Sequence, residues 1–140
     1  MSTLRLIAPM AALSTAIALG AAAAHAQELE EVKIVFEQAI PNIPGKSLVV
    51  QVVSYPPGVK SASHRHAASA FIYARVLSGA VRSQVNDEPV KVYQVGESWY
   101  EMPGSHHRVS ENASDREPAS LLAVVVVDSN DRPLTIPDRK

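Results

Sequence analysis

Four histidines in the middle of the chain have types and spacing that could bind a transition metal. His64 and His66 are separated by one residue, and His106 and His107 are adjacent. Side chains of an extended strand alternate between its faces, so His64 and His66 share a face and at most one of the other two can join them. Three imidazoles are therefore the natural maximum, and they suit iron, manganese, nickel, copper or zinc. The alternative is a set of surface histidines in loops.

The composition narrows both the site and its partners. The chain has no cysteine, which excludes thiolate metal sites and leaves histidine, carboxylate or amide as ligands. It carries 13 Lys and Arg against 14 Asp and Glu, a net charge of −1. Without a basic surplus we expect no nucleic-acid partner, and small molecules are the favoured ligands.

The N-terminus has the pattern of a secretory signal peptide. Residues 1–5 carry one positive charge, residues 6–24 are apolar and rich in alanine, and Ala24-His25-Ala26 is a small-x-small cleavage site. We expect cleavage after Ala26, a periplasmic or secreted protein, and no stable membrane insertion afterwards. The alternative is an uncleaved membrane anchor. Removal of 26 of the 140 residues leaves 114, enough for one domain.

The rest of the chain has the pattern of an all-β protein. Short segments rich in Val, Ile, Leu and Tyr alternate with turns that contain Pro, Gly, Asn and Asp. This pattern predicts a sandwich or small antiparallel barrel. The expected strands are residues 32–38, 47–55, 71–77, 80–85, 90–95, 98–101 and 121–127.

One of these segments, residues 121–127, is continuously apolar. A run without alternation should be covered on both faces, which predicts a central strand or a strand at a subunit contact. We divide the chain into the signal peptide at 1–26, an N-terminal arm or strand at 27–46, a barrel at 47–128 and a C-terminal tail at 129–140.

Gly58, His64, His66 and Gly79 resemble the first motif of the cupin superfamily. That motif reads Gly, five residues, His-x-His, three or four residues, Glu, six residues, Gly. The first three positions and the closing glycine match in this chain.

A later stretch resembles the second cupin motif, which reads Gly, five residues, Pro-x-Gly, two residues, His, three residues, Asn. Gly96, Gly104 and His107 fall at the family's spacing, with Met102 in place of the proline and Asn112 one position late. The resemblance covers about half of the chain that remains after signal cleavage.

The resemblance implies a cupin-type jelly roll of six to eight antiparallel strands. It implies that His64, His66 and His107 bind the metal inside the barrel and that His106 points away. Since cupins commonly pair, it also implies a homodimer, with which the apolar run 121–127 agrees.

The family's glutamate is absent from the first motif. Its place falls on Ala70 or Phe71 counted from His66, and on Ile72 counted back from Gly79. None of these side chains can bind a metal, so the site is either an open three-histidine centre or one completed from elsewhere.

Glu101 is the candidate for a carboxylate from elsewhere, because it lies just before the turn that leads to His107. The alternative is a solvated charge at a strand end, or a partner for Arg108 or Arg75.

The expected function is metal-dependent chemistry of the dioxygenase kind on a small organic substrate. Glu101 would assist proton transfer, and Tyr73 could do so if it faces the cavity. An isomerase or lyase that uses the metal as a Lewis acid is also compatible, because a fold does not fix a reaction. The alternative from another class is a non-catalytic periplasmic module that binds or senses a small ligand or a metal.

Overall fold

The computed structural model describes residues 29–139, so the predicted signal peptide lies outside the described residues. The described chain forms ten strands. Between residues 29 and 139 no helix is long and apolar enough to cross a membrane. The strands are β1 (Glu31–Ala39), β2 (Lys46–Tyr55), β3 (His64–His66), β4 (Phe71–Ser78), β5 (Ala80–Val85), β6 (Lys91–Gln94), β7 (Ser98–Glu101), β8 (His106–Asn112), β9 (Ala119–Asp128) and β10 (Thr135–Pro137).

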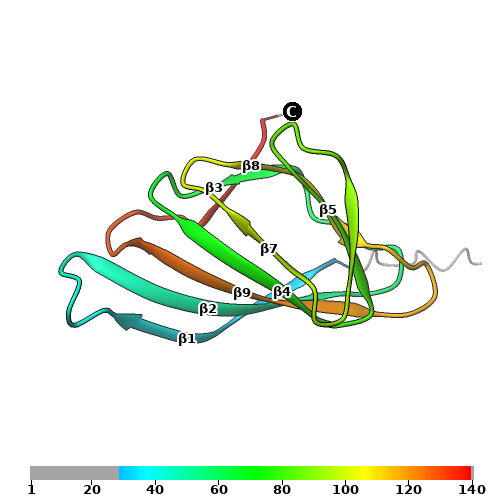
Figure 1. The fold of residues 1–140 in the computed structure, drawn as a ribbon, viewed down its shortest axis with the longest axis horizontal. Helices are drawn as coiled ribbons and strands as arrows, with labels where there is room; N and C mark the ends of the chain where they lie inside the picture. The colour runs from blue at the N-terminus through cyan, green and yellow to red at the C-terminus, as the bar shows by residue number, and fades with distance from the viewer. Residues whose placement is uncertain (1–28, 140) are drawn as a thin grey trace, which may run out of the picture.

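The strands are arranged in two antiparallel sheets that face each other (Figure 1). The first sheet has the order β1-β2-β9-β4-β7, and the second has the order β10-β3-β8-β5-β6. The all-β prediction of a cupin-type jelly roll is confirmed. The two sheets form a β-sandwich rather than a closed barrel, because no strand ladder among the described residues joins them.

The central strand of the first sheet is β9, which contains the apolar run 121–127. The expectation of a central strand is confirmed, since β9 pairs with β2 on one side and β4 on the other. Alternate residues from Ala119 to Val127 are buried in the core. The expected cover on the opposite face is incomplete, because Leu122, Val124 and Val126 are only half-buried in this chain.

The core is built from small and β-branched side chains of the first sheet's inner face. It includes Val49, Val76, Val125 and Val127, each almost fully buried. Such residues suit a pleated surface that is packed on one side. Because many of the inward residues are valine and alanine, space remains between the sheets for a cavity.

Two three-residue strands, β3 and β10, lie at the predicted metal site, and β3 carries His64 and His66. Strand β3 lies between β8 and β10, and β10 is formed by residues that the sequence placed in the C-terminal tail. These residues are tied to the site by an ion pair between Asp138 and His106 and by a hydrogen bond that Ser63 Oγ donates to Asp138. The second sheet therefore holds both histidine-bearing strands side by side.

Candidate metal centre

Strand pairing places the histidines of the two motifs opposite one another. In the β3/β8 pair, His64 lies opposite His107 and Arg65 lies opposite His106. Alternation then directs His64, His66 and His107 towards the interior. Arg65 and His106 take the other face, where the Arg65 guanidinium donates to the Gly104 carbonyl.

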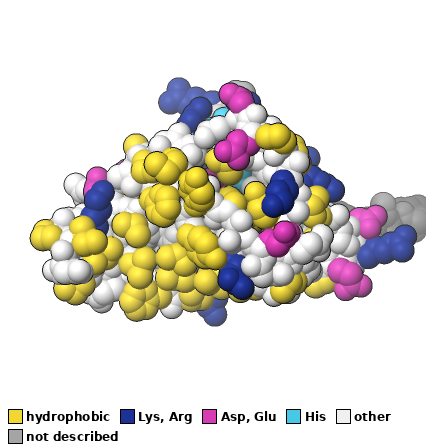
Figure 2. Space-filling view, viewed as in Figure 1, with side chains coloured by type: hydrophobic (Ala, Val, Ile, Leu, Met, Phe, Trp, Pro, Cys, Tyr) yellow, Lys and Arg dark blue, Asp and Glu magenta, His cyan; other side chains and the backbone are white. Residues whose placement is uncertain are grey.

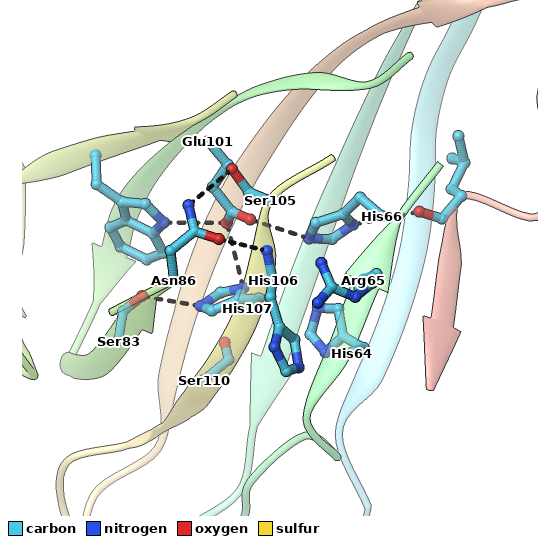
Figure 3. Close-up of polar contacts among 12 residues, drawn as sticks. His64, Arg65, His66, Ser83, Asn86, Glu101, Ser105, His106, His107 and Ser110 are labelled. Atoms are coloured by element: carbon cyan, nitrogen blue, oxygen red, sulfur yellow. Dashed lines mark hydrogen bonds and ion pairs between the residues drawn. The ribbon is translucent and has the colours of Figure 1, made fainter. Parts of the chain in front are cut away.

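The structure brings the three histidines together, as Figure 3 shows. The ring centroids are 4.8 Å apart for His64 and His66, 5.1 Å for His64 and His107, and 6.2 Å for His66 and His107. One ring nitrogen from each residue lies within 4.8 Å of the others. His64 and His107 are buried, and His66 is nearly so.

Each imidazole is anchored by the nitrogen that faces away from the cluster. His64 Nδ1 donates to the Ala62 carbonyl at 2.7 Å, and His66 Nδ1 donates to the Leu134 carbonyl at 3.2 Å. His107 Nε2 contacts Ser83 Oγ at 2.8 Å. Because a carbonyl can only accept, His64 and His66 each carry a proton on Nδ1 and turn Nε2 inwards, and His107 turns Nδ1 inwards. Such outer contacts are the usual means of orienting metal-binding histidines.

Glu101 lies inside the cluster, at the end of β7. It is 2 % exposed, so the interpretation of a solvated strand-end charge is wrong. Its Oε1 lies 3.2 Å from His107 Nδ1 and accepts from Trp99 Nε1, while its Oε2 lies 3.4 Å from His66 Nε2. Oε2 is buried without a hydrogen-bond partner.

Strand register explains how Glu101 reaches this position. In the β4/β7 pair, Glu101 lies directly opposite Ile72. Ile72 is one of the positions where the cupin motif would place its glutamate. The carboxylate therefore comes from the neighbouring strand, about one strand spacing of 4.8 Å from the position that the motif predicts.

The protonation states favour a metal site. Burial lowers the pKa of His107 to about 4, against the opposing effect of Glu101. Burial also lowers the pKa of His64. Burial alone would raise the pKa of Glu101, but the contacts with His66 and His107 outweigh it and bring that pKa below its usual value. Near neutral pH His64 and His107 are thus neutral imidazoles beside a carboxylate.

These groups fit a divalent transition metal ion. The inward nitrogens of His66 and His107 lie 3.4 Å and 3.2 Å from the oxygens of Glu101. Two acceptors at such a distance need a proton or a cation between them. The unpaired Oε2 of Glu101 is the specific observation in favour of an ion.

Two of the residues considered from sequence lie outside the site. His106 contacts Asp138 Oδ2 at 2.7 Å and Ser63 Oγ at 3.0 Å. Tyr73 is 37 % exposed and lies between the inward-facing Ile72 and Ala74 on β4, so alternation turns it away from the cavity. The condition for Tyr73 to assist proton transfer, that its side chain faces the cavity, is not met in this structure.

A cavity of about 120 Å³ lies between the sheets next to the histidines. Its walls are largely apolar, with Ile72, Trp99 and Leu121 among them. Gln51 also lines the cavity, although nothing in the sequence singled it out. A lone glutamine in a strand has no spacing pattern that could have identified it.

Comparison with protein families gives one match. Residues 51–125 match the model of the Cupin domain, which is more than half of the chain. No curated protein matches the sequence.

Several solved structures share the fold. An uncharacterized conserved protein with a double-stranded β-helix domain from Klebsiella pneumoniae is 21 % identical, with a TM-score of 0.61 over 81 % of this chain and 89 % of that one. The DMSP lyase DddQ from Ruegeria pomeroyi is 19 % identical, with a TM-score of 0.52 over 64 % of this chain and 42 % of that one. An oxalate oxidase is 16 % identical, with a TM-score of 0.50 over 59 % of this chain and 46 % of that one. At these identities the likeness establishes the fold, and the match spans less than half of the two enzymes.

Proposed function

Because the chain belongs to the cupin family, we propose that it is a metal-dependent enzyme that binds one divalent transition metal and acts on a small organic substrate. His64, His66 and His107 would hold the metal, with Glu101 beside it. The observation that carries the proposal is the convergence of three anchored imidazoles on a buried carboxylate whose Oε2 is unpaired.

When bound, the metal would supply Lewis acidity and, for a redox-active ion, electron transfer. The protein's own groups would do the remaining work. The cavity walls would hold the substrate and limit the water around it, and a Glu101 oxygen that the metal leaves free would accept or return a proton at the reacting carbon or oxygen.

Two reaction classes follow from this arrangement. Dioxygenase-type oxidation is favoured by a centre with few protein ligands, because positions remain for substrate and oxygen. A lyase or isomerase reaction is favoured by the buried Glu101, because a carboxylate in an apolar cavity can serve as a general base. Solved relatives in fold include both an oxalate oxidase and a DMSP lyase.

The metal is tested first, by elemental analysis of purified protein. We expect about one equivalent of a transition metal in the native protein and little in a His64→Ala, His66→Ala double variant. His106→Ala is the matched control, since His106 is adjacent to His107 but faces Asp138. Equal metal content in all three proteins would reject the site.

The reaction class is tested on the metal-loaded protein with a set of small organic acids, with and without oxygen. Oxygen consumption coupled to product formation identifies an oxidase or dioxygenase. Product formation that does not need oxygen identifies a lyase or isomerase. Binding without turnover of any acid would instead support the non-catalytic binding or sensing module.

We also place the protein outside the cytoplasm, on the basis of the signal-peptide pattern of residues 1–26. N-terminal sequencing of the protein recovered from cells should begin at Gln27. A chain that begins at Met1 would contradict export by cleavage.

A further inference from the structure

A row of inward side chains crosses the first sheet beneath the cavity. Strand register places Ile34, Gln51, Ala123, Ala74 and Trp99 side by side on β1, β2, β9, β4 and β7. The two alanines in the middle of the row leave open space between the larger Gln51 and Trp99. All of these except Ile34 line the cavity.

Gln51 is a largely buried polar residue whose side chain turns into the cavity. It is 7 % exposed, and it is one of the residues that line the cavity. The cost of burying an amide is offset when its donor and acceptor find hydrogen-bond partners, and in the cavity a bound molecule can supply them.

Another buried amide in the same protein shows the usual arrangement. Asn112 is 5 % exposed, and its Nδ2 donates to the carbonyls of Tyr55, Pro56 and Glu117. Its Oδ1 accepts from the backbone N–H of Ser114. Asn112 is thus a structural amide held by the backbone, whereas the Gln51 amide lines the cavity, where a bound molecule can meet it.

The rest of the lining restricts the charge of that molecule. Of the described residues that line the cavity, none is Lys or Arg, and two are the acids Glu30 and Glu101. A metal ion would therefore be the sole strong attraction for an anionic group. A second negative charge on the ligand would lie among apolar walls and carboxylates, without a cation.

We propose that Gln51 is a specificity-determining residue for a small organic acid that carries one negative charge. The carboxylate of the acid would bind the metal, and its short apolar body would lie over Ala74 and Ala123. A neutral hydrogen-bonding group, such as a hydroxyl, would pair with the Gln51 amide. This inference rests on the proposed function, since the carboxylate end requires the metal.

The volume of the cavity sets the size of the acid. A cavity of about 120 Å³ is small beside the roughly 300–1,000 Å³ of pockets that hold drug-sized ligands, so it suits acids of a few carbon atoms. Trp99 is the chain's single tryptophan and lines the cavity, so its fluorescence can report binding directly.

The test uses metal-loaded full-length mature protein and unbranched carboxylic acids of three to five carbons. Each acid with a terminal hydroxyl is paired with the acid in which a methyl replaces that hydroxyl. Affinities are measured by Trp99 fluorescence and by calorimetry. At the chain length that reaches Gln51, we expect the hydroxylated acid to bind about 5- to 20-fold more tightly. Gln51→Leu should abolish this preference and retain the metal.

The matched control is Gln94→Leu, because Gln94 is exposed on β6 and does not line the cavity. It should keep the wild-type preference for the hydroxylated acid. A wild-type protein without such a preference at any length, or a Gln51→Leu variant that keeps it, would overturn the inference.

A second variant fills the space without touching either end of the ligand. Ala123→Val should weaken all of the acids and leave the metal content unchanged. Unchanged binding in this variant would show that the acids bind elsewhere, against the inference. Failure of the proposed function has a different signature, because acids would then bind the His64→Ala, His66→Ala variant as tightly as the native protein.

Discussion

Glu101 is the residue that most changes the interpretation of the site. A carboxylate that is 2 % exposed and ionised needs strong compensation, and the tryptophan N–H at 3.2 Å supplies one hydrogen bond to Oε1. Oε2 faces His66 Nε2 without a hydrogen bond. A metal ion next to Oε2 would provide the missing compensation.

Replacement of Glu101 tests this role directly. Glu101→Gln keeps the shape and removes the charge, and we expect the metal dissociation constant to rise about 10- to 100-fold. The measurement is competition with a chelator of known affinity. Glu97→Gln is the control, because Glu97 is exposed in the turn before β7. Equal affinities in both variants and the native protein would show that Glu101 does not contact the ion.

That His64 and His66 share a face could be predicted from alternation within a strand, whereas the choice of His107 over His106 came from the resemblance to the second cupin motif. The role of Glu101 could be raised as a question but not decided, because its position depends on the register of β7 against β4. Gln51 was missed for the same reason, since it joins Ala123, Ala74 and Trp99 only through pairing between strands.

At the level of elements, the strands rich in apolar residues were predicted, including the four-residue β7, whereas β3, β10 and the polar seven-residue β8 were not. The predicted segments 47–55 and 80–85 correspond to β2 and β5 with ends within one residue. Strands β3 and β10 have three residues each, too few to show alternation. They exist as strands because each pairs with a neighbour.

Gly79, between β4 and β5, is a position where the fold requires glycine. Its φ is +64°, and a Cβ there would lie 2.4 Å from the Pro118 carbonyl oxygen. We expect Gly79→Ala to lower the free energy of unfolding by about 1–3 kcal/mol, measured by chemical denaturation.

Gly58→Ala is the matched control for that contact. Gly58 also has a positive φ, +72°, but a Cβ there would meet nothing within 4 Å. The loss at Gly79 should therefore exceed the loss at Gly58. Equal losses would mean that backbone conformation alone accounts for both.

Asp131 connects the turn before β4 with the segment after β9. Its Oδ2 accepts from the backbone N–H and from the hydroxyl of Ser69, and these bonds lower the pKa of Asp131 below 3.8. The folded state thus favours the carboxylate. The associated stability is present above pH 3.8 and is lost as the pH falls through the folded-state pKa.

We expect Asp131→Asn to lower Tm at pH 7 and to have a smaller effect at pH 3, measured by thermal unfolding at both values. Asp115→Asn serves as the control, since the Asp115 side chain is 87 % exposed. A difference in Tm that stays constant with pH would contradict the role of the ionised carboxylate.

At the level of the whole molecule, the first sheet has an apolar outer face. Figure 2 shows hydrophobic side chains gathered over β2, β9 and β4. Lys46 and Asp128 form an ion pair at one end of this face, and Lys33 and Arg75 lie on it in the row of Val52 and Leu122. The apolar part of the outer face comprises Phe36, Leu48, Val50, Val52, Phe71, Tyr73, Tyr100, Leu122, Val124 and Val126.

We expect a second copy of the chain to cover this face. An apolar centre with a polar rim is the usual anatomy of a dimer interface, and two sheets pack well face to face. Tyr73 would then serve association, since it points to the outer face.

Sedimentation or light scattering at micromolar concentrations should detect a dimer, and Tyr73→Lys should shift it towards the monomer. Val92→Lys is the control, because Val92 is 37 % exposed on β6 of the second sheet. A native protein that is monomeric, or two variants that dissociate equally, would contradict this interface.

The position of Glu101 also has a consequence for motion within the molecule. The histidines belong to β3 and β8 of the second sheet, whereas Glu101 belongs to β7 at the edge of the first. A metal bound by all four residues would link the two sheets where no ladder joins them. Local opening of β7 would then require release of the ion, so amide hydrogen exchange in β7 would slow when metal binds, although this strand contributes no histidine.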